Sequence, residues 1–231
     1  MSASPRSLRE PGDGVLARGA AAVYQVLVLE LLLLVTASPG LVLLVLLVPD
    51  TSNAPLVALA LLPVGPALSA TLFAWRACPT GGDLQPARHF RRGYRANVVD
   101  VLRWWAPALC LMAVLVTNLA HLELAVAPAV PRAVVGTLLV VLLVATVLWS
   151  AHVLVLTSLF TLRTRDAALL GLHHLGRART TLGAASLLVL AAGTVLVTSD
   201  WVLALLGSLF ALVLLHNARP MIADVEENHT A

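Results

Sequence analysis

The stretch AVVGTLLVVLLVATVLWSAHVLVLTSLFTL, from Ala133 to Leu162, contains no charged residue and decides the class of fold. The hydrocarbon core of a bilayer is about 30 Å thick, and an α-helix needs about 20 apolar residues to cross it. The whole chain is 59% hydrophobic and only 12% charged, whereas an ordinary soluble domain is about 45–50% apolar. A soluble fold of this length also needs polar groups over most of its surface. The composition therefore predicts an all-α membrane protein.

Five further apolar segments flank this stretch, so we expect a polytopic helical bundle of about six transmembrane helices. They form a single membrane domain, residues 20–217, between a cytoplasmic N-terminal tail (1–19) and a cytoplasmic C-terminal tail (218–231). Proline removes a helix donor and crowds the preceding turn, so a kink is expected in the second span. The predicted spans are 20–48, 55–75, 104–122, 133–162, 182–198 and 201–216.

The second span also carries a face of small residues. Gly65 lies about one turn before the adjacent pair Ser69 and Ala70, at the interruption formed by Pro63 and Pro66. Small side chains let two helix backbones approach closely within a membrane. We therefore expect another helix to pack against this face.

The distribution of arginine predicts the orientation of the bundle. The chain has no lysine and 15 arginines, and Arg132 alone falls between spans on the side that also holds Asp50, Glu123 and Asp200. Cytoplasmic loops carry the excess of basic residues in membrane proteins. Both termini are therefore expected in the cytoplasm, which requires an even number of spans.

An alternative concerns the first span, because the basic N-terminus, the apolar run and Val35-Thr36-Ala37 imitate a cleavable signal peptide. Cleavage after Ala37 would leave five spans in the same orientation. However, Glu30 interrupts the apolar region, and 41–48 would remain as a short apolar remnant. Both features favour a first span that is retained.

The linker before the third span has an amphipathic pattern. Phe90, Tyr94, Val98 and Val101 recur at helical spacing, which predicts a helix lying on the inner membrane surface. The helix would lead into Trp104-Trp105, a pair suited to the membrane interface, where an indole ring is half buried and its N–H stays wet.

The linker after the fourth span carries a narrower apolar stripe of Leu169, Leu172 and Leu175, beside a polar face with His173-His174. Adjacent helical residues point in different directions, so this histidine pair predicts a solvated face rather than a metal site. Both linkers could dock a partner protein, and resting on the anionic inner leaflet is the simpler interpretation. The candidate docking or lipid-binding residues are Phe90, Arg91, Arg92, Tyr94, Arg95, Arg163, Arg165, Arg177 and Arg179.

Glu30 is the most informative single residue, because an ionised carboxylate within a bilayer costs several kcal/mol unless it is paired, hydrated or protonated. His152 is the best candidate partner, since imidazole can share a proton with a carboxylate. Asn118 and His121 are weaker candidates. Glu30 could line a polar path, or it could tie two helices together, and the second interpretation is the simpler one.

The motifs of common enzyme classes do not occur. The sequence contains no GxSxG, HExxH, Walker-type loop or glycine-rich dinucleotide fingerprint. Cys78 and Cys110 are its only cysteines and form no CxxC pair, so a disulfide framework or structural zinc site is not expected. The arginines are scattered among apolar segments, which argues against nucleic-acid binding. We expect no catalytic residues, no cofactor and no metal.

Three stretches resemble the YesL-like family of bacterial integral membrane proteins (domain of unknown function 624): Pro66–Phe73, Phe90–Asn97 and Leu159–Asp166. The chain differs at Thr161–Asp166, which has neither the proline nor the aromatic residue usual there. The resemblance implies a multi-pass protein of a bacterial plasma membrane, associated with carbohydrate ABC transporters. It supplies no catalytic residues.

We therefore expect an accessory or regulatory subunit of a membrane complex, with ABC transporter components as partners. The alternative is a small secondary transporter or channel that uses Glu30. Such carriers often repeat interrupted helices at matching places in each half. Here the interruptions fall in the first span, at Pro39-Gly40, and in the second, at Pro63 and Pro66, so the two halves do not mirror one another.

Overall fold

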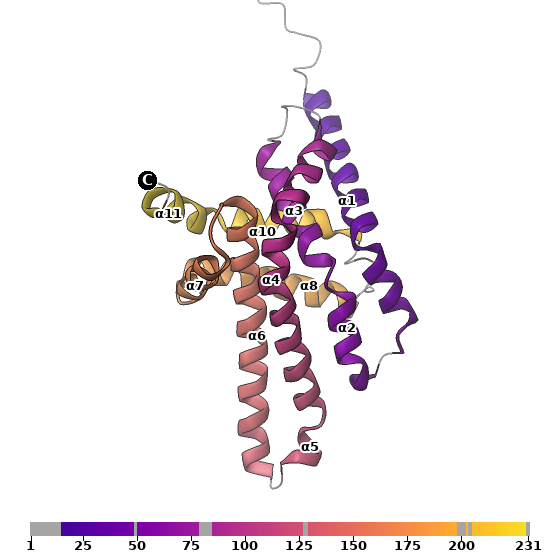
Figure 1. Ribbon diagram of the computed structural model, residues 1–231, viewed down its shortest axis with the longest axis vertical. Coiled ribbons are helices and arrows are strands. Elements are labelled where there is room, and N and C mark those ends of the chain that lie inside the picture. Colours follow the sequence, from indigo (N-terminus) through magenta and orange to yellow (C-terminus); the bar gives the residue numbers. More distant parts are fainter. Residues whose placement is uncertain are drawn as a thin grey trace, which may run out of the picture.

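The computed structural model describes residues 15–48, 50–78, 85–126, 129–197, 202 and 205–229, and every regular element among them is helical. The prediction of an all-α protein is confirmed for this part of the chain. Helices α1 (Val15–Leu46), α4 (Pro86–Ala120) and α6 (Ala129–Leu159) run along the long axis of the molecule (Figure 1). Each of the three is long and apolar enough to cross a membrane. The shorter elements are η1 (Thr51–Asn53), α2 (Ala54–Ala60), α3 (Val64–Ala77), α5 (Leu122–Ala125), α7 (Thr164–Leu175), α8 (Ala178–Val197), α10 (Gly207–Asn217) and α11 (Arg219–His229).

The second predicted span is a bent pair of helices. The axes of α2 and α3 differ by 43°, and Pro63 occupies the N-cap position of α3. Pro66 follows in the first turn, where its missing N–H leaves no helical hydrogen bond unmade. The kink predicted from the prolines is confirmed. With the bent pair taken as one span, the described residues contain up to four membrane-length spans, and the six-span count stays a prediction.

The small-residue face of α3 packs as predicted. Ala67, Ala70, Leu72 and Ala74 of this helix are fully buried, because α1, α4, α6 and α10 all contact it. A Cβ placed on Gly65 would lie 2.6 Å from Cδ1 of Trp105, a distance that the present packing cannot accommodate. The glycine therefore allows the close approach of α4.

Helix α4 is continuous from Pro86 to Ala120, a length of about 52 Å at about 1.5 Å per residue. The prediction of a separate helix lying on the membrane surface was wrong. Phe90 and Val101 pack inward at 4% and 0% exposure, and a Cβ on Gly93 would lie 2.7 Å from Cβ of Phe73. The apolar stripe of this linker therefore packs on α3, so the linker continues the axis of the third span.

The half-buried environment predicted for Trp104 was also wrong. Its side chain is 3% exposed and meets the ring of Trp149 edge to face, with 5.9 Å between centroids. Trp105 is partly buried and donates its Nε1–H to the Leu61 carbonyl at 3.0 Å. The indole N–H that was expected to meet water instead bonds the broken end of α2.

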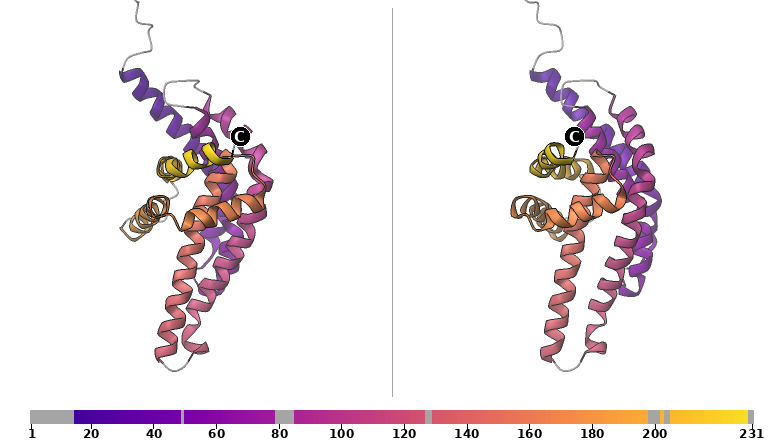
Figure 2. Two further views of the ribbon diagram at one scale, coloured as in Figure 1. Left: turned by 90° about the vertical axis from the view of Figure 1, so that its left-hand side faces the viewer. Right: turned by 60° about the vertical axis from the view of Figure 1, so that its left-hand side comes forward.

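Four C-terminal helices, α7, α8, α10 and α11, lie across the long helices beside the C-terminal half of α6 (Figures 1 and 2). Helices α8 and α10 occupy the fifth and sixth predicted spans, although 198–201 lies outside the described residues. The segment predicted as a tail, 218–231, contains α11. Met221, Ile222 and Val225 of this helix are at most 7% exposed, so α11 packs into the bundle.

Candidate functional site

Glu30 and the first turn of α10 form a buried junction. The backbone N–H of Ser208 donates to Oε2 of Glu30 at 2.8 Å. Glu30 is buried, with 8% of its surface exposed. The N-cap residue of α10 is Leu206, which has no polar side chain to cap the helix. The first amides of a helix lack internal partners, and its N-terminus carries a partial positive charge. Glu30 of α1 therefore supplies the cap that the local sequence of α10 lacks.

Ser208 makes two further contacts, one with α3 and a second one with α1. Its carbonyl accepts the Trp75 Nε1–H of α3 at 3.0 Å, and its hydroxyl reaches the Val26 carbonyl of α1 at 3.4 Å. Ser208 is fully buried and Trp75 is 9% exposed. We call these four residues, Glu30, Ser208, Trp75 and Val26, the Glu30 junction. Oε1 of Glu30 has no hydrogen-bond partner there, so the carboxylate is only half satisfied.

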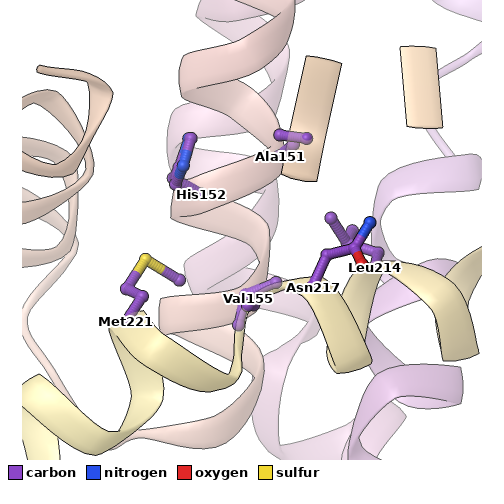
Figure 3. A pocket seen from close by; sticks show the side chains of 8 residues that line it. Ala151, His152, Val155, Leu214, Asn217 and Met221 are labelled. Carbon is purple, nitrogen blue, oxygen red and sulfur yellow. The ribbon is translucent and has the colours of Figure 1, made fainter. Parts of the chain in front are cut away.

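His152 is not the partner of Glu30. Its Nδ1 lies 2.7 Å from the Leu148 carbonyl in its own helix, α6. Its ring borders a cavity of about 10 Å³ toward Asn217 and Met221 (Figure 3), which is about the volume that one water needs. Glu30 meets the N-terminus of α10 and His152 lies near its C-terminus, so the two side chains are roughly 15 Å apart along this helix. The weaker candidates also bond within their own helix, since Asn118 donates to Val114 and His121 faces Thr117.

A second polar contact between helices was not predicted. Asn97 of α4 donates its Nδ2–H to Oγ of Ser69 at 3.3 Å and to the Ser158 carbonyl at 3.2 Å. The hydroxyls of Ser69 and Ser158 are 2.8 Å apart, and both serines are at most 3% exposed. We call Ser69, Asn97 and Ser158 the serine–asparagine cluster. It joins α3, α4 and the end of α6, so the start of α4 lies beside the start of α7.

The predicted docking residues separate into exposed and buried groups. Phe90 belongs to the core at 4% exposure, and Tyr94 is half buried with its ring 6.4 Å from that of Phe90. The arginines around them are exposed. Among the described residues, no carboxylate forms an ion pair with any of these predicted arginines except Arg177. The exposed set, which we call the basic face, is Arg88, Arg91, Arg92, Arg95, Arg163 and Arg165.

Arg177 differs, because its Nη1 pairs with Oδ2 of Asp224 in α11 at 2.8 Å. His174 approaches the same oxygen with Nε2 at 3.2 Å, while its Nδ1 faces the Leu170 carbonyl at 2.9 Å. The hydrogen bond from Arg177, helped by His174, lowers the pKa of Asp224 below its ordinary value. This contact ties α7 to α11. The side chain of Arg179 lies outside the described residues.

The prediction of a solvated histidine face on α7 was wrong for His174, which is fully buried. Leu169 and Leu172 of the predicted leucine stripe face outward, at 57% and 58% exposure. The buried face consists of Ala167, Gly171 and His174. Sequence analysis missed this face, and the small residues Ala167 and Gly171 at i and i+4 are the signal that could have found it, because a Cβ on Gly171 would lie 2.6 Å from Cγ2 of Val153 in α6.

Within the described ranges, no group of three or more His, Cys, Asp or Glu side chains is placed to hold a metal ion. No model of a known protein family, no curated protein and no solved structure matches this chain. The part of the chain that the structure describes defines a helical protein, in which three helices are long and apolar enough to cross a membrane. The Glu30 junction and the serine–asparagine cluster join its helices to one another.

Proposed function

We propose that the chain is a multi-pass protein of a bacterial plasma membrane that acts as an accessory or regulatory subunit of a membrane complex. In this proposal it has six spans, both termini are cytoplasmic, and it is a YesL-like protein associated with carbohydrate ABC transport. The observation that supports docking is the basic face, whose exposed arginines have no acidic partner among the described residues.

Electrostatic complementarity is what such a surface offers a partner. Clustered cations raise the association rate with an acidic surface and disfavour a basic one. By contrast, Arg103 on the same helix already pairs with Asp100 at 2.8 Å. Exposed ion pairs of this kind contribute little to the stability of the fold. The docking proposal therefore concerns the start of α4 and the α6–α7 connection, and not all of α4.

The Glu30 junction favours a subunit over an ion-coupled carrier. One carboxylate oxygen is held by the first turn of α10, which gives Glu30 a task in joining helices. A carrier would use a carboxylate that exchanges partners during transport. The bound carboxylate supports the accessory role, and the carrier is one outcome of the test below.

The test is co-purification from the native membrane in mild detergent. We expect a transporter component to be recovered with the wild-type chain and lost with Arg91→Glu, Arg92→Glu and Arg95→Glu, each made singly. Arg103→Glu changes charge equally on the same helix and should retain the partner. Unchanged recovery with all three variants would contradict the docking proposal, and solute movement by the purified chain alone in liposomes would favour the carrier.

The proposed orientation has its own test. Cysteines introduced at Arg92 and at Leu124, which is 87% exposed in α5, should react with an impermeant reagent from opposite sides of the membrane. The background variant lacks Cys110, the exposed native cysteine. Labelling of both positions from one side would contradict the orientation.

A further inference from the structure

A groove of about 620 Å³ lies between α1 and the first turns of α4. Pockets that bind small molecules have volumes of about 300–1,000 Å³. Leu32 and Thr36 line it from α1, while Arg88, Phe90, Arg91 and Tyr94 line it from α4. This groove is separate from the Glu30 junction, none of whose residues line it.

The two walls of the groove have different chemistry. Arg88 and Arg91 are both exposed, and their spacing puts them on one face of α4. Phe90 is buried beneath them at 4% exposure. On α1, the hydroxyl of Thr36 already donates to the Leu32 carbonyl at 2.7 Å, so this wall offers mainly hydrocarbon. None of the described residues that line the groove is a carboxylate.

The apolar wall continues outside the groove onto an open face of α1. Leu31 and Val35, neighbours of the lining residues, are 61% and 62% exposed. Two cations beside a continuous apolar strip match a molecule that has an anionic group at one end and hydrocarbon at the other. A guanidinium binds phosphate oxygens by charge-assisted hydrogen bonds. An acidic peptide would pair with the arginines, but it would leave the apolar strip of α1, Leu31 and Val35, uncovered.

We propose that this groove binds a phospholipid with an anionic headgroup. The phosphate lies between Arg88 and Arg91, and an acyl chain follows Leu32 and Thr36 toward Val35. The proposal rests on the membrane location given above and is independent of the partner complex, because it is tested on the purified chain alone.

The experiment is native mass spectrometry of the purified full-length chain in detergent micelles. The probes are dioleoyl-phosphatidylglycerol and dioleoyl-phosphatidylcholine, which share the same acyl chains, and inorganic phosphate is added as a competitor. The test variant is Arg88→Gln with Arg91→Gln. Its control is Arg163→Gln with Arg165→Gln, which removes the same charge elsewhere on the basic face. Ala87→Trp keeps every charge and places a large side chain on exposed Ala87, which also lines the groove.

We expect phosphatidylglycerol to bind the wild-type chain and the control equally, in preference to phosphatidylcholine. The Arg88/Arg91 variant should bind it about thirtyfold more weakly, which corresponds to about 1 kcal/mol per arginine. Ala87→Trp should weaken it at least tenfold. The proposal is overturned by equal binding of the two lipids, by equal loss in test and control variants, by undiminished binding to Ala87→Trp, or by displacement with inorganic phosphate.

Discussion

Removing the Glu30 carboxylate should loosen the first turn of α10. A hydrogen bond to a charged group contributes about 1.5–3 kcal/mol, and the helix dipole contributes to the same contact. Oε1 has no partner, so we count a single hydrogen bond and take about 2 kcal/mol for Glu30→Ala. Leu206 cannot replace the lost cap. Glu30→Gln retains a neutral acceptor at the same place and should lose about 1 kcal/mol.

Amide hydrogen exchange in detergent micelles measures this effect at the residue concerned, because local opening determines the rate. About 2 kcal/mol corresponds to about thirtyfold faster exchange of the Ser208 amide in Glu30→Ala, and about 1 kcal/mol to about fivefold in Glu30→Gln. Glu123→Ala is the control, since that carboxylate is 84% exposed and lies 3.9 Å from Arg132. Exchange in α10 should not change in this variant.

Unchanged protection of Ser208 in Glu30→Ala would refute the capping role. Equal effects of alanine and glutamine would show that the charge accounts for the whole contact, because the neutral acceptor of glutamine would then restore nothing. If Glu30→Gln kept α10 protected and yet abolished a solute flux that the wild-type chain carries, Glu30 would be a transport residue, and the carrier function would replace the accessory one.

Three further predictions concern packing, the serine–asparagine cluster and pH. Gly93→Ala should lower the free energy of unfolding by about 1–3 kcal/mol, because its Cβ would meet Phe73 at 2.7 Å. The control is Gly193→Ala, whose Cβ meets nothing within 4 Å and which should not destabilise the protein. Thermal unfolding in detergent compares the two variants. Asn97→Leu should cost about 1–3 kcal/mol by leaving buried polar groups unpaired, and Ser69→Ala should cost less in that background than alone, which a double-mutant cycle measures; additive costs would contradict the cluster. The docking of α11 should weaken as the pH falls below 3.8, the ordinary pKa of Asp224. The folded state lowers this pKa, so the ionised carboxylate stabilises the fold above pH 3.8, and this stabilisation is lost as the carboxylate takes up a proton. Limited proteolysis of α11 measures the loss, and a pH profile identical in Asp224→Asn would contradict it.

Local patterns in the sequence were sufficient to predict the apolar helices. An apolar run satisfies its backbone groups within one helix whatever its neighbours are, so the extents of α1, α6 and α8 follow closely from composition. Pro63 and Pro66 act on the backbone directly, which is why the bend between α2 and α3 could be predicted. The prediction that another helix packs on the small-residue face at Gly65 and Ser69 was confirmed for a similar reason, since a small or missing side chain leaves space for any partner helix.

The sequence by itself determined that the long apolar segments are helical and where arginine gathers, because both depend on neighbours along the chain. Only the tertiary structure decided which face of each helix is covered. An amphipathic stripe is equally suited to lipid and to another helix, so Phe90 and Val101 were assigned to the membrane surface although they pack on α3. The Glu30 contact joins residues 178 positions apart, and no local pattern in α10 indicates that its cap comes from α1. His174 is buried for the same kind of reason, because its partner Asp224 comes from a helix that sequence analysis treated as a tail.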